Sequence, residues 1–173
     1  DLFKAIAARH SYRGPFTGKA PSRDDLCSIV EAGIRAPSGC NAQTTAFIIV
    51  DDPGLIRRIA EVLDKDFIAQ SGAVIVCVID HRPLCVGKSF AVEDCAAAVE
   101  NMLLAITSLG FATVWLDGVL RSNNRAEQIA ALLHVPRERQ VRVVLPVGAP
   151  AETGTQKEKL PFERRACFNR WNI

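Results

Sequence analysis

Residues 89–109 carry the longest helical pattern in this chain, and this segment restricts the possible folds more than any other. Its apolar residues recur at intervals of three and four positions: Val92, Ala96, Val99, Met102, Leu103 and Ile106. Three consecutive alanines from Ala96 make one side very small, and Gly110 is a helix-terminating signal. A helix that is apolar over so much of its surface is buried on most sides. The segment is therefore either the central helix of the domain or half of a dimer interface.

Strands and further helices are predicted on both sides of this segment. Residues 73–79 are apolar and mostly β-branched, which predicts a central strand covered on both faces. Other strands are predicted at residues 44–50 (also buried), 111–116 and 141–147. Other helices are predicted at residues 2–7, from Ser22 (with Asp25) to Ile34, from Asp52 to Leu63, and from Asn123 to His134. Few strand–helix–strand units are adjacent, so we predict an α+β fold with a central mixed β-sheet flanked by helices.

The length of 173 residues favours a single domain that spans residues 1–173. Residues 151–165 are polar, and residues 166–173 add Phe168 and Trp171. We therefore expect residues 151–173 to form an extended tail that leaves the core and docks elsewhere, with a second subunit as the expected surface.

Composition excludes several classes of function. The net charge of +2 gives no strong attraction to nucleic acid or to an acidic membrane, and no apolar run approaches a membrane span. Six cysteines without a C-x-x-C pair, together with three histidines, give no metal-binding pattern. Most of these cysteines lie in apolar runs, which is typical of free thiols in a reducing compartment. With no apolar signal segment in residues 1–9, these features predict a cytoplasmic protein.

Two polar segments are candidates for binding. Arg9, Ser11 and Arg13 alternate, so an extended backbone directs all three to one side, where they suit a phosphate group. The alternative is a solvated basic turn. The second segment, residues 36–43, combines Pro and Gly with polar side chains between a helix and a strand. It is either a binding loop for a flat polar molecule or an ordinary connection, and Cys40 within it is either a redox-sensitive thiol or a small filler.

These segments, in this order and spacing, resemble the FMN-dependent nitroreductase family over nearly the whole chain. The resemblance is carried by five stretches: residues 9–13 (RHSYR), 36–43 (APSGCNAQ), 100–105 (ENMLLA), 109–111 (LGF) and 146–148 (PVG) before a basic tail. It implies an α+β homodimer with two FMN sites at the subunit interface and the C-terminal tail exchanged between partners. It also implies ping-pong chemistry: NADH or NADPH delivers hydride to the flavin, and a small-molecule acceptor then takes the electrons.

The resemblance assigns site residues one by one. Arg9 and Ser11, with His10 between them, match the contacts to the flavin phosphate and ribityl chain, and Lys157 and Lys159 match the basic pair that completes this site. Arg13 matches the basic residue beside the pyrimidine edge of the ring. The loop that reaches the flavin from the partner subunit is matched by Pro37, Ser38, Gly39 and Asn41, with Gln43 in support. The turn near flavin N5 is matched by Leu116, Asp117 and Gly118, of which the backbone N–H groups are the expected donors.

No dedicated catalytic residue is expected, because positioning of the two rings does most of the work. Residues 79–89 leave no room for the lid found in larger relatives, so we expect an open site that reduces nitroaromatics, quinones or similar acceptors. Two alternatives remain: a relative that degrades its own flavin to a benzimidazole, and a flavin-binding module with little turnover.

Overall fold

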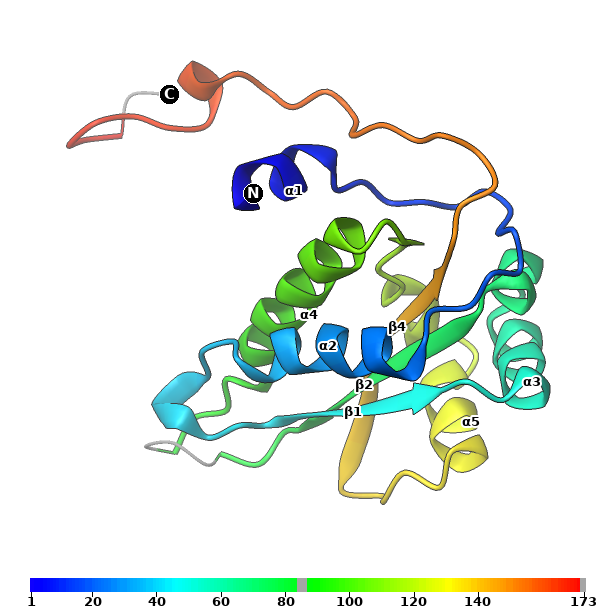
Figure 1. The fold of residues 1–173 in the computed structure, drawn as a ribbon. Helices are drawn as coiled ribbons and strands as arrows, with labels where there is room; N and C mark the ends of the chain where they lie inside the picture. The colour runs from blue at the N-terminus through cyan, green and yellow to red at the C-terminus, as the bar shows by residue number, and fades with distance from the viewer. Residues whose placement is uncertain (84–86, 172–173) are drawn as a thin grey trace.

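The computed structural model describes residues 1–83 and 87–171, and Figure 1 shows their arrangement. The α-helices are α1 (Leu2–Ala8), α2 (Arg23–Ile34), α3 (Pro53–Leu63), α4 (Ala91–Ser108) and α5 (Arg125–Leu132). The strands are β1 (Thr45–Val50), β2 (Ala73–Asp80), β3 (Ala112–Thr113) and β4 (Arg139–Gly148). Short 3₁₀ turns are η1 (Gly39–Asn41), η2 (Asp66–Gln70), η3 (Gly118–Arg121) and η4 (Phe162–Arg164).

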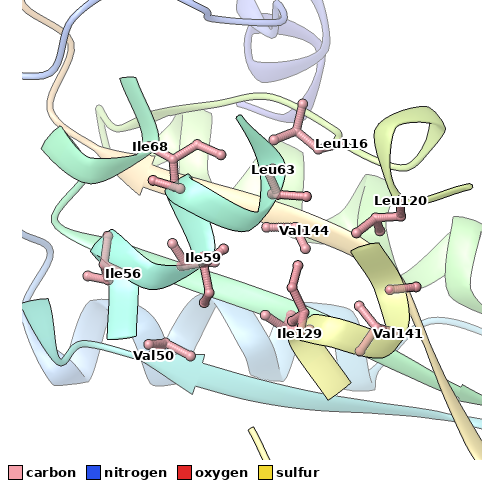
Figure 2. Close-up of a cluster of buried hydrophobic side chains, with 14 of the residues drawn as sticks. Val50, Ile56, Ile59, Leu63, Ile68, Leu116, Leu120, Ile129, Val141 and Val144 are labelled. Carbon is pink, nitrogen blue, oxygen red and sulfur yellow. The ribbon is translucent and has the colours of Figure 1, made fainter. Parts of the chain in front are cut away.

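The predicted central strand is confirmed: β2 lies inside a sheet of order β1-β2-β4-β3, and all eight of its residues are buried. Its side chains alternate between the two faces. Val74, Val76 and Val78 face the cluster built with α3 and α5, which Figure 2 shows in close-up. Ile75, Cys77 and Ile79 face the cluster built with α2 and α4. The sheet is therefore covered by helices on both faces, as an α+β fold requires.

The prediction of a mixed sheet is wrong, because every strand pairing in the described residues is antiparallel. The connection between β1 and β2 explains why these two strands pair in antiparallel orientation. Asp64 takes a left-handed conformation (φ 54°) and ends α3, and Lys65 N–H then donates to the carbonyl of Ala60. The turn η2 thus returns along α3, and the chain re-enters the sheet at the end where β1 finished.

Two helices begin at the capping residues that the sequence predicted, and a third helix does not. Ser22 and Asp25 form a reciprocal capping box at α2, and Asp52 accepts the Leu55 N–H at the start of α3. The prediction that Asn123 caps the helix is wrong. Asn124 occupies the N-cap position of α5 in a left-handed conformation, and its side chain forms no capping hydrogen bond. Asn123 is also left-handed (φ 55°), so the two asparagines serve a turn instead.

Two of the predicted strands are weaker than expected. The segment 111–116 forms only the two-residue β3 and an isolated bridge from Leu116 to Val144. Strand β1 is partly exposed, because it lies at the edge of the sheet in one chain, so the prediction of a buried strand there is wrong.

The long apolar helix is α4, and its first predicted role is confirmed: it packs on the sheet and beside α2. Val99, Met102 and Ile106 are completely buried in this packing. Beyond β4, residues 151–171 are extended apart from η4, and Figure 1 shows them running past α1 away from the sheet. Within the described ranges, no helix combines the length and apolar character needed to cross a membrane.

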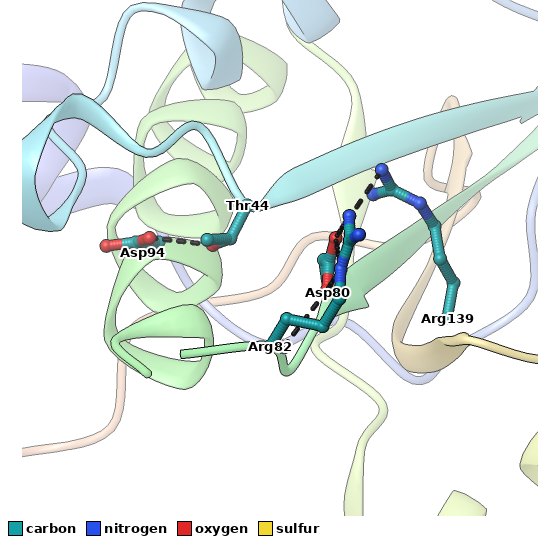
Figure 3. Close-up of polar contacts among 5 residues, drawn as sticks. All are labelled: Thr44, Asp80, Arg82, Asp94 and Arg139. Carbon is teal, nitrogen blue, oxygen red and sulfur yellow. Dashed lines mark hydrogen bonds and ion pairs between the residues drawn. The ribbon is translucent and has the colours of Figure 1, made fainter. Parts of the chain in front are cut away.

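A buried carboxylate holds the far end of β2. Asp80 is 2% exposed and accepts three hydrogen bonds from the Arg82 guanidinium and one from the Arg82 backbone N–H. The Arg139 guanidinium lies 3.8 Å from Asp80 Oδ2. Figure 3 shows Arg82 and Arg139 directed at this carboxylate. The hydrogen bonds from Arg82 hold the pKa of Asp80 well below its usual range.

This arrangement predicts a pH dependence of stability. Since the pKa of Asp80 is lower in the folded than in the unfolded chain, its contribution is complete above the unfolded pKa and is lost as the pH falls from about 5 towards 2. Asp80→Asn should therefore be less stable than the wild type at pH 7, and the difference should shrink as the pH falls. Urea unfolding at several pH values measures this. The exposed Asp24→Asn is the control, and an Asp80→Asn difference that is independent of pH would contradict the assignment.

Candidate functional site

The predicted phosphate-binding residues line one hollow of about 310 Å³ between the N-terminal segment and the tail. Its lining comprises Arg9, His10, Ser11, Arg13, Thr155, Gln156, Lys157 and Lys159. These two segments are almost 150 positions apart in the chain, so only the fold brings them together. All six predicted residues of the two segments are therefore found at one place.

Tyr12 orients the N-terminal half of this hollow. It is 4% exposed, and its backbone N–H donates to Thr113 of β3. Its hydroxyl accepts the backbone N–H groups of Ala151 and Glu152, at 3.2 and 3.3 Å. Because Tyr12 points inwards from extended backbone, its neighbours Ser11 and Arg13 point outwards, as the alternation predicted.

Two tail residues that the sequence analysis missed hold the other half of the hollow in place. Gln156 donates from Nε2 to the carbonyls of Arg9 (2.7 Å) and Ile6 (3.1 Å), which attaches the tail to the end of α1. Gly154 lies directly against the His10 ring, and a Cβ atom there would overlap His10 Nε2. Neither contact has a local sequence signal, because each joins residues more than 140 positions apart.

The side chains of this hollow fit a phosphate monoester. Four cationic side chains and the Ser11 hydroxyl face it, and such charge-assisted donors suit a dianion. Glu100 on α4 offsets part of this charge, since its carboxylate lies 3.7 Å from Arg9 Nε. His10 donates from Nδ1–H to the Ala8 carbonyl, while its Nε2 is buried without a hydrogen-bond partner in the described structure.

The loop of residues 36–43 borders a second hollow, of about 340 Å³, beside α2, β1 and the small face of α4. Pro37, Ser38 and Gln43 contribute to its lining. Gly39 lies flush against the Phe90 ring, so a Cβ there would overlap that ring. Asn41 and Gln43 are exposed, and Gln43 Nε2 donates to the carbonyl of Asn41 at 3.4 Å.

The two hollows share no lining residue. Within one chain, the predicted loop residues therefore do not join the predicted phosphate-binding residues.

In the third predicted element, the turn at Leu116, fewer groups are available to bind a flavin than the sequence predicted. The Leu116 N–H donates to the carbonyl of Val144 (3.1 Å), so it is not available as a donor to a flavin. The Asp117 carboxylate accepts from Arg121 and lies 3.3 Å from Arg142, so this side chain serves the protein itself. Only the backbone of Asp117 and Gly118 remains for the predicted contact to a flavin.

Residues 84–86 lie outside the described residues. The connection expected to lack a lid includes them, so its conformation is not described.

Cys40 is exposed and disulfide-bonded, so the expectation of a free thiol at this position is wrong. Local sequence does not show such a bond, because spatial proximity decides which cysteines pair.

Comparison with known proteins identifies the family. The model of the nitroreductase family matches residues 6–73 and 63–149, which is most of the chain. This chain belongs to the nitroreductase family. It is 31% identical over 170 residues to an Archaeoglobus fulgidus protein named as an NADH dehydrogenase/NAD(P)H nitroreductase, covering 98% of this chain and 94% of the relative. The nitroreductases are oxidoreductases, so the chain is an enzyme of that class.

Solved structures of nitroreductases have the same fold. A Parabacteroides distasonis protein, also named as an NADH dehydrogenase/NAD(P)H nitroreductase, superposes with a TM-score of 0.86 at 27% identity, covering 98% of both chains. The NADPH:FMN oxidoreductase of Vibrio harveyi, solved with NAD⁺, has a TM-score of 0.84 at 22% identity and covers 99% of this chain and 78% of its own. The resemblance predicted from the sequence is thus confirmed at the level of family and fold.

Proposed function

We propose that this nitroreductase is an FMN-dependent NAD(P)H oxidoreductase that reduces nitroaromatic, quinone or similar acceptors as a homodimer. The observation that carries the proposal is the hollow of about 310 Å³ that gathers Arg9, Arg13, Lys157 and Lys159 around Ser11. The relatives support it: the Archaeoglobus fulgidus protein is named for NAD(P)H, and the Vibrio harveyi enzyme for NADPH and FMN.

The residues of the hollow bind and orient the cofactor. Arg9, Lys157 and Lys159 neutralise the phosphate, and the Ser11 hydroxyl donates a hydrogen bond. Arg13 places a positive charge beside the ring, which favours the reduced state because only that state carries the added negative charge. When bound, FMN would supply the ring that accepts the hydride. No acid–base residue of the chain is required.

The homodimer follows from the two separate hollows. The loop residues Ser38, Asn41 and Gln43 lie beside the interface of the proposed dimer and complete the site of the partner. The tail supports this arrangement, because its large apolar side chains are exposed in one chain: Leu160 (65%), Phe162 (59%), Phe168 (80%) and Trp171 (82%). The Phe162 and Phe168 rings lie with their centroids 6.2 Å apart, and neighbouring exposed apolar groups are typical of an association surface.

Asn41→Ala tests the role of the loop. We expect FMN affinity to fall about tenfold in a protein that still dimerises, since one buried hydrogen bond across the interface is lost. Fluorescence titration with FMN measures the affinity, and light scattering measures the dimer. Asn123→Ala is a matched control, because Asn123 is also exposed and left-handed (φ 55°, against 54° for Asn41). Unchanged FMN content in Asn41→Ala means that the loop does not contact the flavin.

Anaerobic mixing with each nicotinamide tests the function itself. The proposal expects the flavin absorbance to be bleached by NADH or NADPH and to return when a nitroaromatic or quinone is added. A protein that takes up no FMN refutes the proposal. Uptake without bleaching identifies a flavin-binding module, and a benzimidazole product after exposure to oxygen identifies a flavin-degrading enzyme.

A further inference from the structure

One buried carboxylate connects the two ends of the loop that borders the second hollow. Asp94, in the first turn of α4, is 5% exposed. Its Oδ1 accepts the Gly39 N–H at 2.8 Å, and its Oδ2 accepts the Thr44 hydroxyl at 2.6 Å. Figure 3 shows Thr44 directed at Asp94 from the start of the strand. Gly39 begins the turn η1 and Thr44 directly precedes β1, so each oxygen holds one end of residues 39–44.

The loop between these two points needs such support. Three of its residues that are not glycine adopt left-handed backbone conformations: Cys40 (φ 51°), Asn41 (φ 54°) and Gln43 (φ 50°). Such a conformation is unfavourable for a residue with a side chain and persists only where the surroundings impose it. Within the loop, the Gln43 N–H donates to Ser38 Oγ at 3.0 Å. Further support comes from the disulfide bond of Cys40, from Asp94 and from the contact of Gly39 with Phe90.

The Asp94 carboxylate contributes more to the conformation of the loop than to the stability of the core. A buried charge is costly, and an apolar residue of similar size often stabilises a fold more. No Lys, Arg or His in the described ranges forms an ion pair with Asp94, so hydrogen bonds must offset that cost. Its two oxygens accept hydrogen bonds from Thr44 and Gly39, which are 50 and 55 positions away and lie at the two ends of the loop. The buried carboxylate therefore holds the loop in a single conformation.

We propose that Asp94, acting with Thr44, is a positioning residue that pre-forms the loop for FMN in the partner's site. The inference rests on the proposed function, which assigns this loop to the flavin. A pre-formed loop has no ordering cost to meet when the cofactor binds. If the loop is released, only the fraction of molecules with the competent conformation binds, and the apparent dissociation constant rises in inverse proportion to that fraction.

The test uses substitutions at both partners and a matched control. Asp94→Ala removes both hydrogen bonds, and Thr44→Val removes only the one to Oδ2. Thr44→Ser retains the hydroxyl, and Glu93→Ala removes an exposed acid next to Asp94 on the same helix turn. Hydrogen exchange of residues 39–44 in the FMN-free protein measures the loop directly. Fluorescence titration measures FMN affinity, and urea unfolding measures global stability.

We expect faster exchange at residues 39–44 and an FMN dissociation constant about tenfold higher in Asp94→Ala and Thr44→Val, corresponding to a competent fraction of about one tenth. Thr44→Ser and Glu93→Ala should match the wild type in both measurements. If Asp94→Ala does not fold, the Thr44→Val and Thr44→Ser pair decides the question.

Three results overturn the inference. The first is FMN affinity in Thr44→Val equal to that of a flavin-binding wild type, which leaves the proposed function intact. The second is an affinity loss that follows global stability, with no local change in exchange and no rescue by serine. The third is a wild type that binds no FMN. That result removes the proposed function as well, and the exchange data then show only whether Asp94 holds the loop.

Discussion

Arg9→Ala is expected to raise the FMN dissociation constant about 10- to 100-fold while leaving riboflavin binding almost unchanged. A hydrogen bond to a charged group contributes about 1.5–3 kcal/mol, and each 1.4 kcal/mol is a factor of ten in affinity. Riboflavin lacks the phosphate, so it has no group for Arg9 to neutralise. The Arg9 side chain is about one-fifth exposed, so solvent screens this interaction only in part.

Fluorescence titration with both flavins at two salt concentrations makes this measurement. The preference of the wild type for FMN over riboflavin should weaken at high salt and should fall about 10- to 100-fold in Arg9→Ala. Lys4→Ala is the control, because Lys4 is an exposed cation on α1 that does not line the hollow. An equal loss of FMN and riboflavin affinity would place Arg9 at the ring or in the fold, and not at the phosphate.

Removal of the tail after Gly154 is expected to abolish both FMN retention and dimerisation. The truncation deletes Lys157 and Lys159 from the hollow and also the Gln156 contacts to α1. It also deletes the exposed apolar side chains of residues 160–171 that the proposed dimer covers. The sheet and its two clusters should remain folded, because the clusters contain no residue beyond Val147.

Light scattering, FMN titration and far-UV circular dichroism test this expectation together. The control is the double substitution Lys157→Ala and Lys159→Ala, which removes charge but retains the apolar residues. This control should weaken FMN binding in a protein that stays dimeric. A truncated protein that remains a flavin-bound dimer would show that the tail is not exchanged between subunits.

Several elements were predictable because their causes are local. The Ser22–Asp25 capping box and the Asp52 cap depend on residues three positions apart, and both occur as predicted. Strand β2 was predictable from an apolar run that can be satisfied only by burial on both faces. The basic residues of the hollow were identified by resemblance to the family, and the fold brings them together.

Other elements were missed because distant partners decide them. Residues 111–116 have strand propensity, but β4 pairs with only Ala112 and Thr113 and then with Leu116. The direction of the strands depends on where α3 and η2 return the chain, which no strand sequence encodes. Asn123 has the residue type of a helix cap, but its left-handed backbone belongs to a turn.

The sequence by itself therefore determined the types of group available: a small-residue helix, a buried central strand, and cations near both ends of the chain. Only the tertiary structure decided which of these groups meet. It placed Gln156 on Arg9, the backbone of residues 151–152 on Tyr12, and Asp94 on Gly39 and Thr44. The physical reason is that a hydrogen bond between residues 50 to 150 positions apart produces no periodic pattern and no compositional bias in the sequence around either residue.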